Sequence, residues 1–108
     1  MQQPRITYLG HAGFLFEYGG IRMLMDPWFY GAILGSWFPY PYNRFLVPEL
    51  AAARITHLYV SHAHEDHFDP AFLRKLDRNI AILCPDFISE DLLTRLRDLG
   101  FGNIHKVK

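Results

Sequence analysis

The segment His62-Ala63-His64-Glu65-Asp66-His67 holds three of the six histidines of this chain, together with two carboxylates. In an extended segment, residues two apart point to the same side, so His62 and His64 can bind one ion together. Asp66 and His67 follow where the chain is expected to turn into a helix, and they can face a second ion. Imidazole and carboxylate groups suit zinc, manganese or iron. The segment therefore predicts a site for one or two metal ions rather than an incidental polar turn.

The residues around this segment predict a strand before it and alternating strands and helices after it. Residues 55–61 are mostly apolar and predict a buried strand. Asp69 can cap a helix that starts at Pro70 and runs to about residue 76, because proline is favoured at the first helical position. Three further elements are expected, namely an apolar strand, a leucine-striped helix and a short last strand: 80–84, 89–100 and 103–108.

The N-terminal part predicts antiparallel strands. Three segments have strand composition: 5–9, 14–18 and 21–26. The pair Gly19-Gly20 separates the last two, and a two-residue glycine turn is typical of a β-hairpin. Because Met23 and Met25 alternate along the third strand, we expect both methionine side chains in the core.

An aromatic loop with several prolines spans residues 27–48, and a short helical turn is expected after it, near 49–54. A loop of this length is often a binding loop or a lid. Trp28 and Trp37 could stack on a ring-shaped substrate or hold an acyl chain. The loop could instead pack against another part of the fold or a second subunit, or pack on itself. Large apolar patches rarely stay exposed on monomers, which favours packing.

Composition limits which binding partners and which cellular location are expected for the protein. The chain has 108 residues, half of them apolar and a fifth charged, which suits a single globular domain. The formal net charge is zero, so there is no electrostatic reason to expect a nucleic-acid partner. The single cysteine, Cys84, cannot form an internal disulfide. With no signal-like N-terminus and no long apolar run, we expect a cytoplasmic protein without a transmembrane segment.

The pattern His62-x-His64-x-Asp66-His67 after a buried strand resembles the signature of the metallo-β-lactamase superfamily. Leu9-Gly10-His11-Ala12-Gly13-Phe14 and Leu24-Met25-Asp26-Pro27-Trp28 resemble the branch that contains ascorbate-6-phosphate lactonase, N-acylphosphatidylethanolamine phospholipase D and CMP-N-acetylneuraminate hydroxylase. The resemblance implies an α/β fold, the N-terminal half of an αββα sandwich, as a β-meander followed by β-α-β-α-β. Residues 1–108 would then form a single domain that is the N-terminal part of a longer one.

The resemblance also implies roles for the residues of the motif. His62 and His64 are expected to ligate one ion, and Asp66 and His67 the second. Asp66 is thereby expected at the catalytic centre as well as in the ligand set. Zinc is the expected ion, in one or two copies, with manganese or iron as alternatives.

Two residues outside the motif are expected near the metals. Asp26 matches an acidic residue of the family, and it either orients a ligand or caps the turn before Pro27. His11 matches a histidine close to the metals in this branch. It either touches the substrate or a metal-bound group, or forms an ordinary hydrogen-bonded turn.

The function that the resemblance implies is metal-dependent hydrolysis, in which metal-activated water attacks an ester, lactone, amide or phosphoester. The substrate is expected to be a small molecule, whether phosphorylated, sugar-like or lipid-like. The remaining ligands of the family come from the second half of the fold, so this chain holds part of the set. It is therefore a piece of a longer enzyme, a chain completed in a homo-oligomer, or a degenerate, non-catalytic metal-binding module. An iron-dependent redox or oxygenase role is a further alternative.

Overall fold

The computed structural model describes residues 3–30, 39, 42–62, 64, 66–86 and 90–107. Trp37, for which a substrate contact is expected, lies outside these residues. The helices and strands are, in chain order, β1 (Arg5–Gly10), β2 (Gly13–Tyr18), β3 (Ile21–Met25), the 3-10 helix η1 (Arg44–Leu46), α1 (Val47–Ala52), β4 (His57–Tyr59), α2 (Pro70–Leu73), β5 (Ala81–Pro85), α3 (Glu90–Asp98) and β6 (Ile104–Val107).

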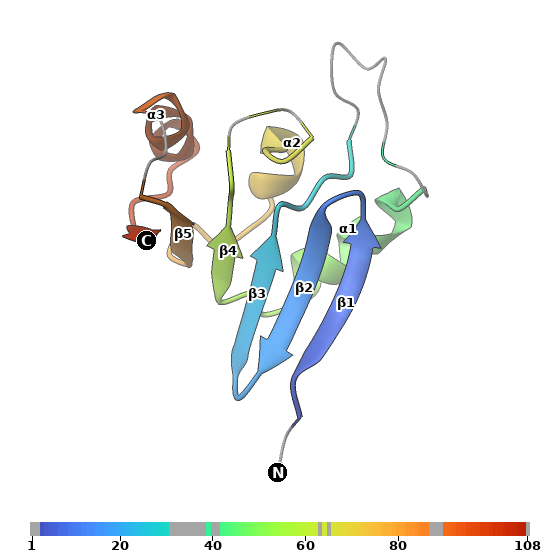
Figure 1. The fold of residues 1–108 in the computed structure, drawn as a ribbon. Coiled ribbons are helices and arrows are strands. Elements are labelled where there is room, and N and C mark those ends of the chain that lie inside the picture. Colours follow the sequence, from blue (N-terminus) through green and yellow to red (C-terminus); the bar gives the residue numbers. More distant parts are fainter. Residues whose placement is uncertain are drawn as a thin grey trace.

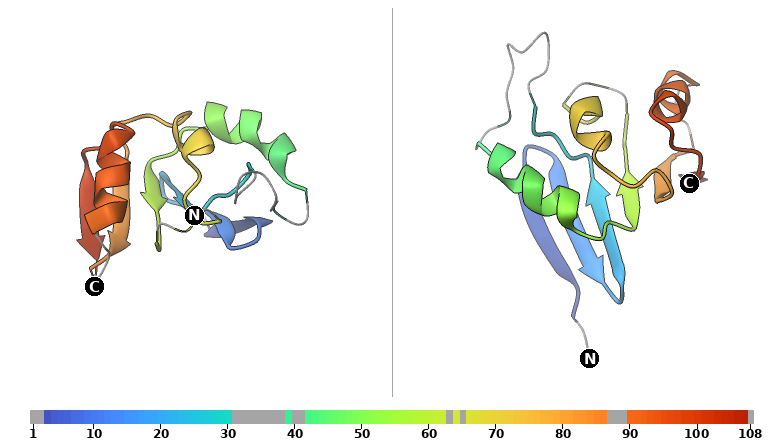
Figure 2. Two further views of the ribbon diagram at one scale, coloured as in Figure 1. Left: turned by 90° about the horizontal axis from the view of Figure 1, so that it is seen from above. Right: turned by 180° about the vertical axis from the view of Figure 1, so that it is seen from behind.

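The six strands form one mixed sheet, in which spatial order follows chain order. β1, β2 and β3 pair antiparallel, whereas β3 to β6 pair parallel. The helices α1, α2 and α3 all lie on one face of this sheet (Figures 1 and 2). The expected half-sandwich, a β-meander followed by β-α-β-α-β with helices on one face, is confirmed.

Several element bounds differ from those expected. The helix that begins at Pro70 ends at Leu73, not near residue 76. Its end is tightened, because Lys75 N donates to Phe72 O and Leu76 N donates to Leu73 O, three residues back. The Arg78 guanidinium also donates to main-chain carbonyls in this turn, which satisfies groups that further helix would have used.

The sheet face beneath the helices carries the core. Leu24, Leu58 and Ile82 are aligned across β3, β4 and β5, and none of them is exposed. We call the side of the sheet to which these three side chains point the covered face. The expectation that Met23 and Met25 belong to the core is wrong, because both are only half-buried. Since side chains alternate along a strand, burying Leu24 turns its two methionine neighbours to the other side.

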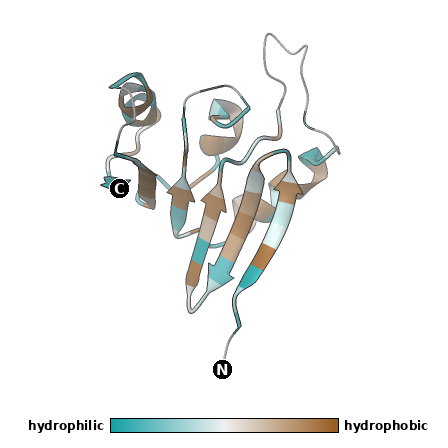
Figure 3. Ribbon diagram, viewed as in Figure 1, coloured by the Kyte–Doolittle hydropathy of each residue, from teal (hydrophilic) through white to brown (hydrophobic). Residues whose placement is uncertain are grey.

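The opposite side of the sheet is apolar and uncovered by any helix of the described residues (Figures 1 and 2). We call it the bare face, and its exposed members on the first three strands are Ile6, Tyr8, Phe14, Tyr18 and Ile21. The register joins Tyr8 to Phe14 across β1 and β2, where their rings lie 5.4 Å apart. Hydrophobic positions recur along β1, β2 and β3 (Figure 3).

The described part of the chain contains no helix with the length and apolar character needed to cross a membrane.

Candidate metal centre

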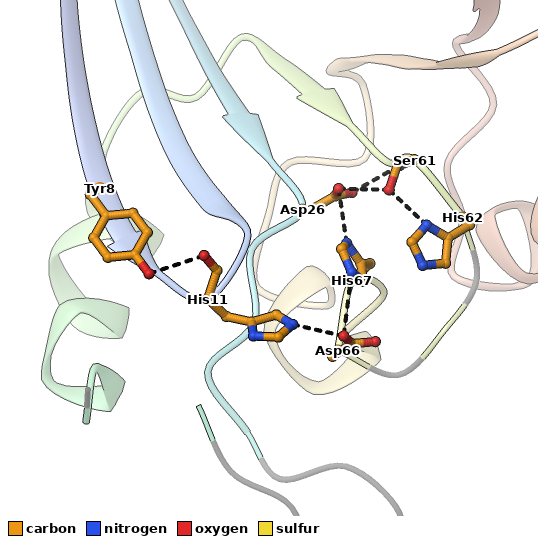
Figure 4. Close-up of polar contacts among 7 residues, drawn as sticks. All are labelled: Tyr8, His11, Asp26, Ser61, His62, Asp66 and His67. Atoms are coloured by element: carbon orange, nitrogen blue, oxygen red, sulfur yellow. Dashed lines mark hydrogen bonds and ion pairs between the residues drawn. The ribbon is translucent and has the colours of Figure 1, made fainter. Parts of the chain in front are cut away.

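Three segments that are distant in the sequence meet at one edge of the sheet. β3 and β4 run parallel, and β1 runs in the same direction as β3, so the three strands end at the same edge. His11 follows β1, Asp26 follows β3, and residues 61–67 follow β4. Figure 4 shows six of these side chains close together, namely those of His11, Asp26, Ser61, His62, Asp66 and His67. The carboxyl ends of parallel strands are where α/β proteins place their sites.

Asp26 joins the ends of β3 and β4. Its Oδ1 accepts a hydrogen bond from Ser61 N at 2.8 Å, and its Oδ2 accepts one from Ser61 Oγ at 2.7 Å. Asp26 N donates to Tyr59 O at 3.0 Å. The carboxylate is buried, and the backbone of Asp26 is left-handed, with φ of 44°. This conformation is uncommon outside glycine, so the surrounding contacts hold the turn in place.

The same carboxylate orients two motif histidines. His67 Nδ1 lies 3.0 Å from Asp26 Oδ2 and donates to it, so a neutral His67 carries its lone pair on Nε2. His62 Nδ1 lies 2.8 Å from Ser61 Oγ, whose own hydrogen goes to Asp26. His62 Nδ1 therefore donates to Ser61, and its lone pair is also on Nε2. Fixing the tautomer through the second ring nitrogen is what metal-ligating histidines usually show.

The motif side chains gather into two groups of potential ligands. Within each group, one ligand atom from every residue lies within 4.8 Å of the others. The first group contains His62, His64 and Asp66, and the second contains His11, Asp66 and His67. The rings of His62 and His64 are 4.5 Å apart, and those of His62 and His67 are 4.1 Å apart. The nitrogen and carboxylate donors fit zinc, manganese or iron.

The electrostatic environment favours the ligating forms of two of these groups. Burial lowers the pKa of His62, and the neighbouring His67 and His64 lower it further, against the opposing effect of Asp26 and Asp66. Burial alone would raise the pKa of Asp66, but the hydrogen bond with His11 and the charge of His67 bring it below its ordinary value. Neutral imidazole and ionised carboxylate are the forms that bind metal ions.

Two positioning residues were missed by the sequence interpretation. Ser61 stands directly before the motif, and a hydroxyl at the end of a buried strand was a signal that could have identified it. Asn43 carried no such signal, because it lies within the aromatic loop. It is buried, and its Nδ2 donates to Leu9 O at 2.7 Å and to Trp28 O at 2.9 Å. It thereby ties the end of β1 to the segment after β3.

Asp69 caps α2 as expected, and it also has a second role. Its Oδ1 accepts from Phe72 N at 3.3 Å, within the first turn of the helix. Its Oδ2 accepts from Phe29 N at 2.9 Å and from Tyr30 N at 3.0 Å. A single buried carboxylate therefore fixes the start of α2 and the chain beyond Asp26 relative to each other.

The other candidate residues take different positions. Trp28 is buried, and its ring lies edge-on to His11 with centroids 5.0 Å apart. Trp28 therefore lies behind the site, and the substrate contact expected of it stays a prediction. His57 and His105 lie in β4 and β6, where they contact Thr56 and Asn103.

Comparison with known proteins supports the fold and identifies the family of the chain. The chain is 44% identical over 100 residues to a protein of Mycolicibacterium smegmatis named "Putative Rieske 2Fe-2S iron-sulfur protein", covering 92% of this chain and 19% of that protein. It is 34% identical over 67 residues to a UPF0173 metal-dependent hydrolase of Pyrobaculum aerophilum, covering 62% of this chain and 26% of the hydrolase. Among solved structures, CmlA, a diiron β-hydroxylase from Streptomyces venezuelae, superposes with a TM-score of 0.67 at 28% identity. That match covers 99% of this chain and 21% of the hydroxylase.

The chain thus spans between about a fifth and a quarter of the length of these proteins. The model of one family, the β-lactamase superfamily domain, matches residues 5–107. Because that match runs through every strand and helix described above, the chain belongs to the β-lactamase superfamily domain family, as the N-terminal half of a metallo-β-lactamase fold.

Proposed function

We propose that this chain supplies part of the metal centre of a hydrolase whose metal-activated water attacks an ester, lactone, amide or phosphoester of a small molecule. The observation that carries this proposal is the cluster around Asp66, in which ligand atoms from His62 and His64 lie within 4.8 Å of it and of each other. The similarity to a metal-dependent hydrolase at 34% identity supports the same coarse activity.

The proposed ligands divide between two ions. His62 and His64 bind the first ion, while Asp66 and His67 bind the second, and further ligands come from outside this chain. Zinc is the proposed ion, with manganese and iron as alternatives. When bound, such ions activate water near neutral pH and stabilise negative charge on the reacting substrate oxygen. Asp66 is the proposed catalytic carboxylate of this chain, because it lies in both groups of potential ligands.

Asp26 and Ser61 are proposed as the residues that position the ligands. Asp26 accepts from His67 Nδ1 directly and reaches His62 through the Ser61 hydroxyl. It therefore orients one ligand of each proposed ion. An Asp26→Asn variant retains a similar shape but loses the charge that favours donation from both partners. We expect its metal affinity to fall about 10- to 100-fold, as is usual when such an outer partner is lost.

The test is metal content after purification without chelator, for the wild type, His64→Ala and His105→Ala. We expect one or two ions per wild-type chain, fewer in His64→Ala, and no change in His105→Ala, since His105 is exposed in β6. Turnover of ester, lactone, amide and phosphodiester probes should disappear on chelation and return with zinc. Equal metal content in the wild type and His64→Ala would overturn the proposed ligands. Metal binding without turnover of any probe would favour a non-catalytic metal-binding module.

A second function, iron-dependent oxidation, is favoured by one specific observation. The chain is 28% identical to a diiron β-hydroxylase over nearly its whole length. The Rieske name belongs to a mycobacterial protein of which this chain matches only 19%, and these 108 residues contain one cysteine where a Rieske cluster takes two. The name therefore supports no cluster within these residues. Purification with iron bound, together with oxygen consumption that zinc abolishes, would select oxidation over hydrolysis.

We also propose that the remainder of the metallo-β-lactamase sandwich covers the bare face. The exposed fractions of Ile6 and Tyr8 are 66% and 54%, and apolar surface of this kind is rarely left in water. The chain spans only 19% of its mycobacterial relative, so chain that could provide the cover exists in such proteins. Pairing with a second copy is the alternative outcome.

The single, buried Cys84 supports the proposal that the protein works in the cytoplasm.

A further inference from the structure

A cavity of about 640 Å³ lies at the end of the sheet opposite the metal centre. It is lined by the start of β1, the end of β2, the Gly19-Gly20 turn and the start of β3, and we call it the hairpin cavity. The metal centre follows the other ends of β1 and β3, and a strand of six residues such as β1 is roughly 20 Å long. Pockets that hold small molecules have volumes of about 300–1,000 Å³. The hairpin cavity is therefore separate from the metal centre and large enough for a ligand of its own.

Three charged side chains of the hairpin cavity stand in one row across the sheet. The register joins Arg5 to Glu17 across β1 and β2, and Glu17 to Arg22 across β2 and β3. Glu17 is two residues from Leu15, which pairs with the buried Leu24, so the row belongs to the covered face. The start of β1 and the turn between β2 and β3 extend past α1 (Figures 1 and 2). Both arginines of the row are accordingly exposed and can be reached by a ligand.

The single carboxylate of this row neutralises only one of its two arginines. Glu17 Oε2 lies 3.2 Å from Arg22 Nε, so the carboxylate is turned toward β3. Within the described part of the chain Arg5 makes no ion pair, although it stands opposite Glu17 in the register. Arginine keeps its charge at every ordinary pH and carries its N–H donors in a planar fork. The hairpin cavity therefore has an excess positive charge, which lies on Arg5.

The second arginine of the row is held in place by its own contacts. Thr56 Oγ1 accepts a hydrogen bond from Arg22 N at 2.9 Å and donates one to Arg22 O at 3.1 Å. Thr56 N donates to the same carbonyl at 2.9 Å. These three bonds fix the main chain of Arg22, and Glu17 fixes the direction of its guanidinium. A group that is oriented before a ligand arrives loses less conformational entropy on binding.

We propose that the hairpin cavity binds a small molecule through an oxyanion group, either a phosphate or a carboxylate. Arg5 is its main cationic partner and Arg22 the second. A guanidinium binds both oxyanions through paired hydrogen bonds, because two of its N–H donors match two oxygen atoms. Glu17 orients Arg22 and weakens the binding by its negative charge. This site goes beyond the proposed metal centre and does not depend on it.

The first test titrates metal-free, nitrogen-15-labelled protein with inorganic phosphate and, separately, with succinate, at constant ionic strength. We expect saturable shifts of the Arg5, Gly19 and Gly20 amide signals with at least one of the two anions. Arg5→Gln should weaken that binding about 10-fold or more, because charge-assisted hydrogen bonds are lost. Arg97→Gln is the control and should change nothing, since Arg97 is an exposed arginine of α3. Shifts confined to residues 62–67, or no saturable shift with either anion, would overturn the proposal.

The second test uses a substitution that should strengthen binding, which a damaged fold cannot imitate. Glu17→Gln keeps an oxygen that accepts from Arg22 Nε but removes the negative charge, so the same anion should bind about 3-fold more tightly. Arg22→Gln should weaken binding. Equal or weaker binding in Glu17→Gln would contradict the proposal. Metal content of Arg5→Gln should equal that of the wild type, and a loss of metal in this variant would show that the two sites are not separate.

Discussion

The covered face and the bare face are made of alternate residues of the same strands, yet on β3 and β4 their apolar residues differ in burial. On β3, Leu24 is fully buried, whereas its neighbours Met23 and Met25 are half-buried. On β4, Leu58 is fully buried and Tyr59 is not. Both faces are hydrophobic in composition, so hydrophobicity alone does not explain the difference. Among the described residues, helices pack on one face and none packs on the other.

This difference indicates where the folding free energy of the chain originates. Burial of apolar surface stabilises by roughly 25 cal/mol per Å², and only surface removed from water counts. The covered face therefore provides most of the stabilisation within these residues. The bare face can contribute only when another part of the fold or another molecule packs on it.

The largest effect is expected from a matched pair on β3. Leu24→Ala removes a fully buried side chain and should cost about 2–5 kcal/mol of unfolding free energy. Met23→Ala removes a side chain of similar size from the bare face and should cost only about 1 kcal/mol. Urea unfolding of both variants measures the two values. Equal losses would show that the two faces are energetically alike and would break the comparison.

A smaller effect is expected at Asn43, which joins the site edge of the sheet to the chain after β3. Asn43→Ala leaves the carbonyls of Leu9 and Trp28 without their buried donor, and we expect a loss of about 1–3 kcal/mol. The exposed Asn79 offers a control, because Asn79→Ala should change stability by less than about 0.5 kcal/mol. Metal affinity should fall in the first variant only. If the two asparagine variants unfold at the same urea concentration, Asn43 does not hold this edge together.

The bare face should cause the 108-residue chain to self-associate when nothing else covers it. Ile6→Lys puts a charge on this face at an exposed position of β1, and we expect association to weaken on the order of 10-fold. Thr7→Lys adds the same charge to the next residue, which points to the opposite side of the sheet, and should weaken it less. Light scattering over a range of concentrations measures both. A wild-type chain that stays monomeric at every concentration would argue against self-association through the bare face.

The smallest effect concerns Cys84, which is buried on the covered face of β5. Burial raises the pKa of its thiol, and the charge of Lys106 opposes this only in part. Because the folded pKa is raised, the stabilisation is fully present below the ordinary thiol pKa of about 8.5 and is lost as the pH rises through the folded value. The wild type should lose more stability than Cys84→Ala over that alkaline range.

Thiol labelling at neutral pH provides an independent measurement for Cys84. We expect the reaction to be at least about 100-fold slower in the folded protein than in urea, because the thiol must wait for an opening of the structure. Rapid labelling of the folded protein would mean that β5 and its cover open easily.

The sequence by itself determined the local features of this protein. Gly19-Gly20 specified the hairpin, and both glycines adopt positive φ as such a turn requires. Asp69 before Pro70 specified the start of α2, and the structure confirms the cap. The sequence also predicted that the histidines at 62–67 lie close together, because neighbouring residues in a short segment cannot be far apart. Interactions of short range leave a short-range pattern in the sequence.

Only the tertiary structure decided which distant residues complete the candidate site. The parallel pairing of β3 and β4 brings Asp26 to Ser61, and the direction of β1 brings His11 to Asp66. The contact of Asn43 with Leu9 left no trace in spacing or composition. The burial of Leu24 rather than Met23 was equally hidden, because both residues are apolar and a strand has two faces. Strand register and the placement of helices choose between those faces, and both depend on contacts between segments far apart in the chain.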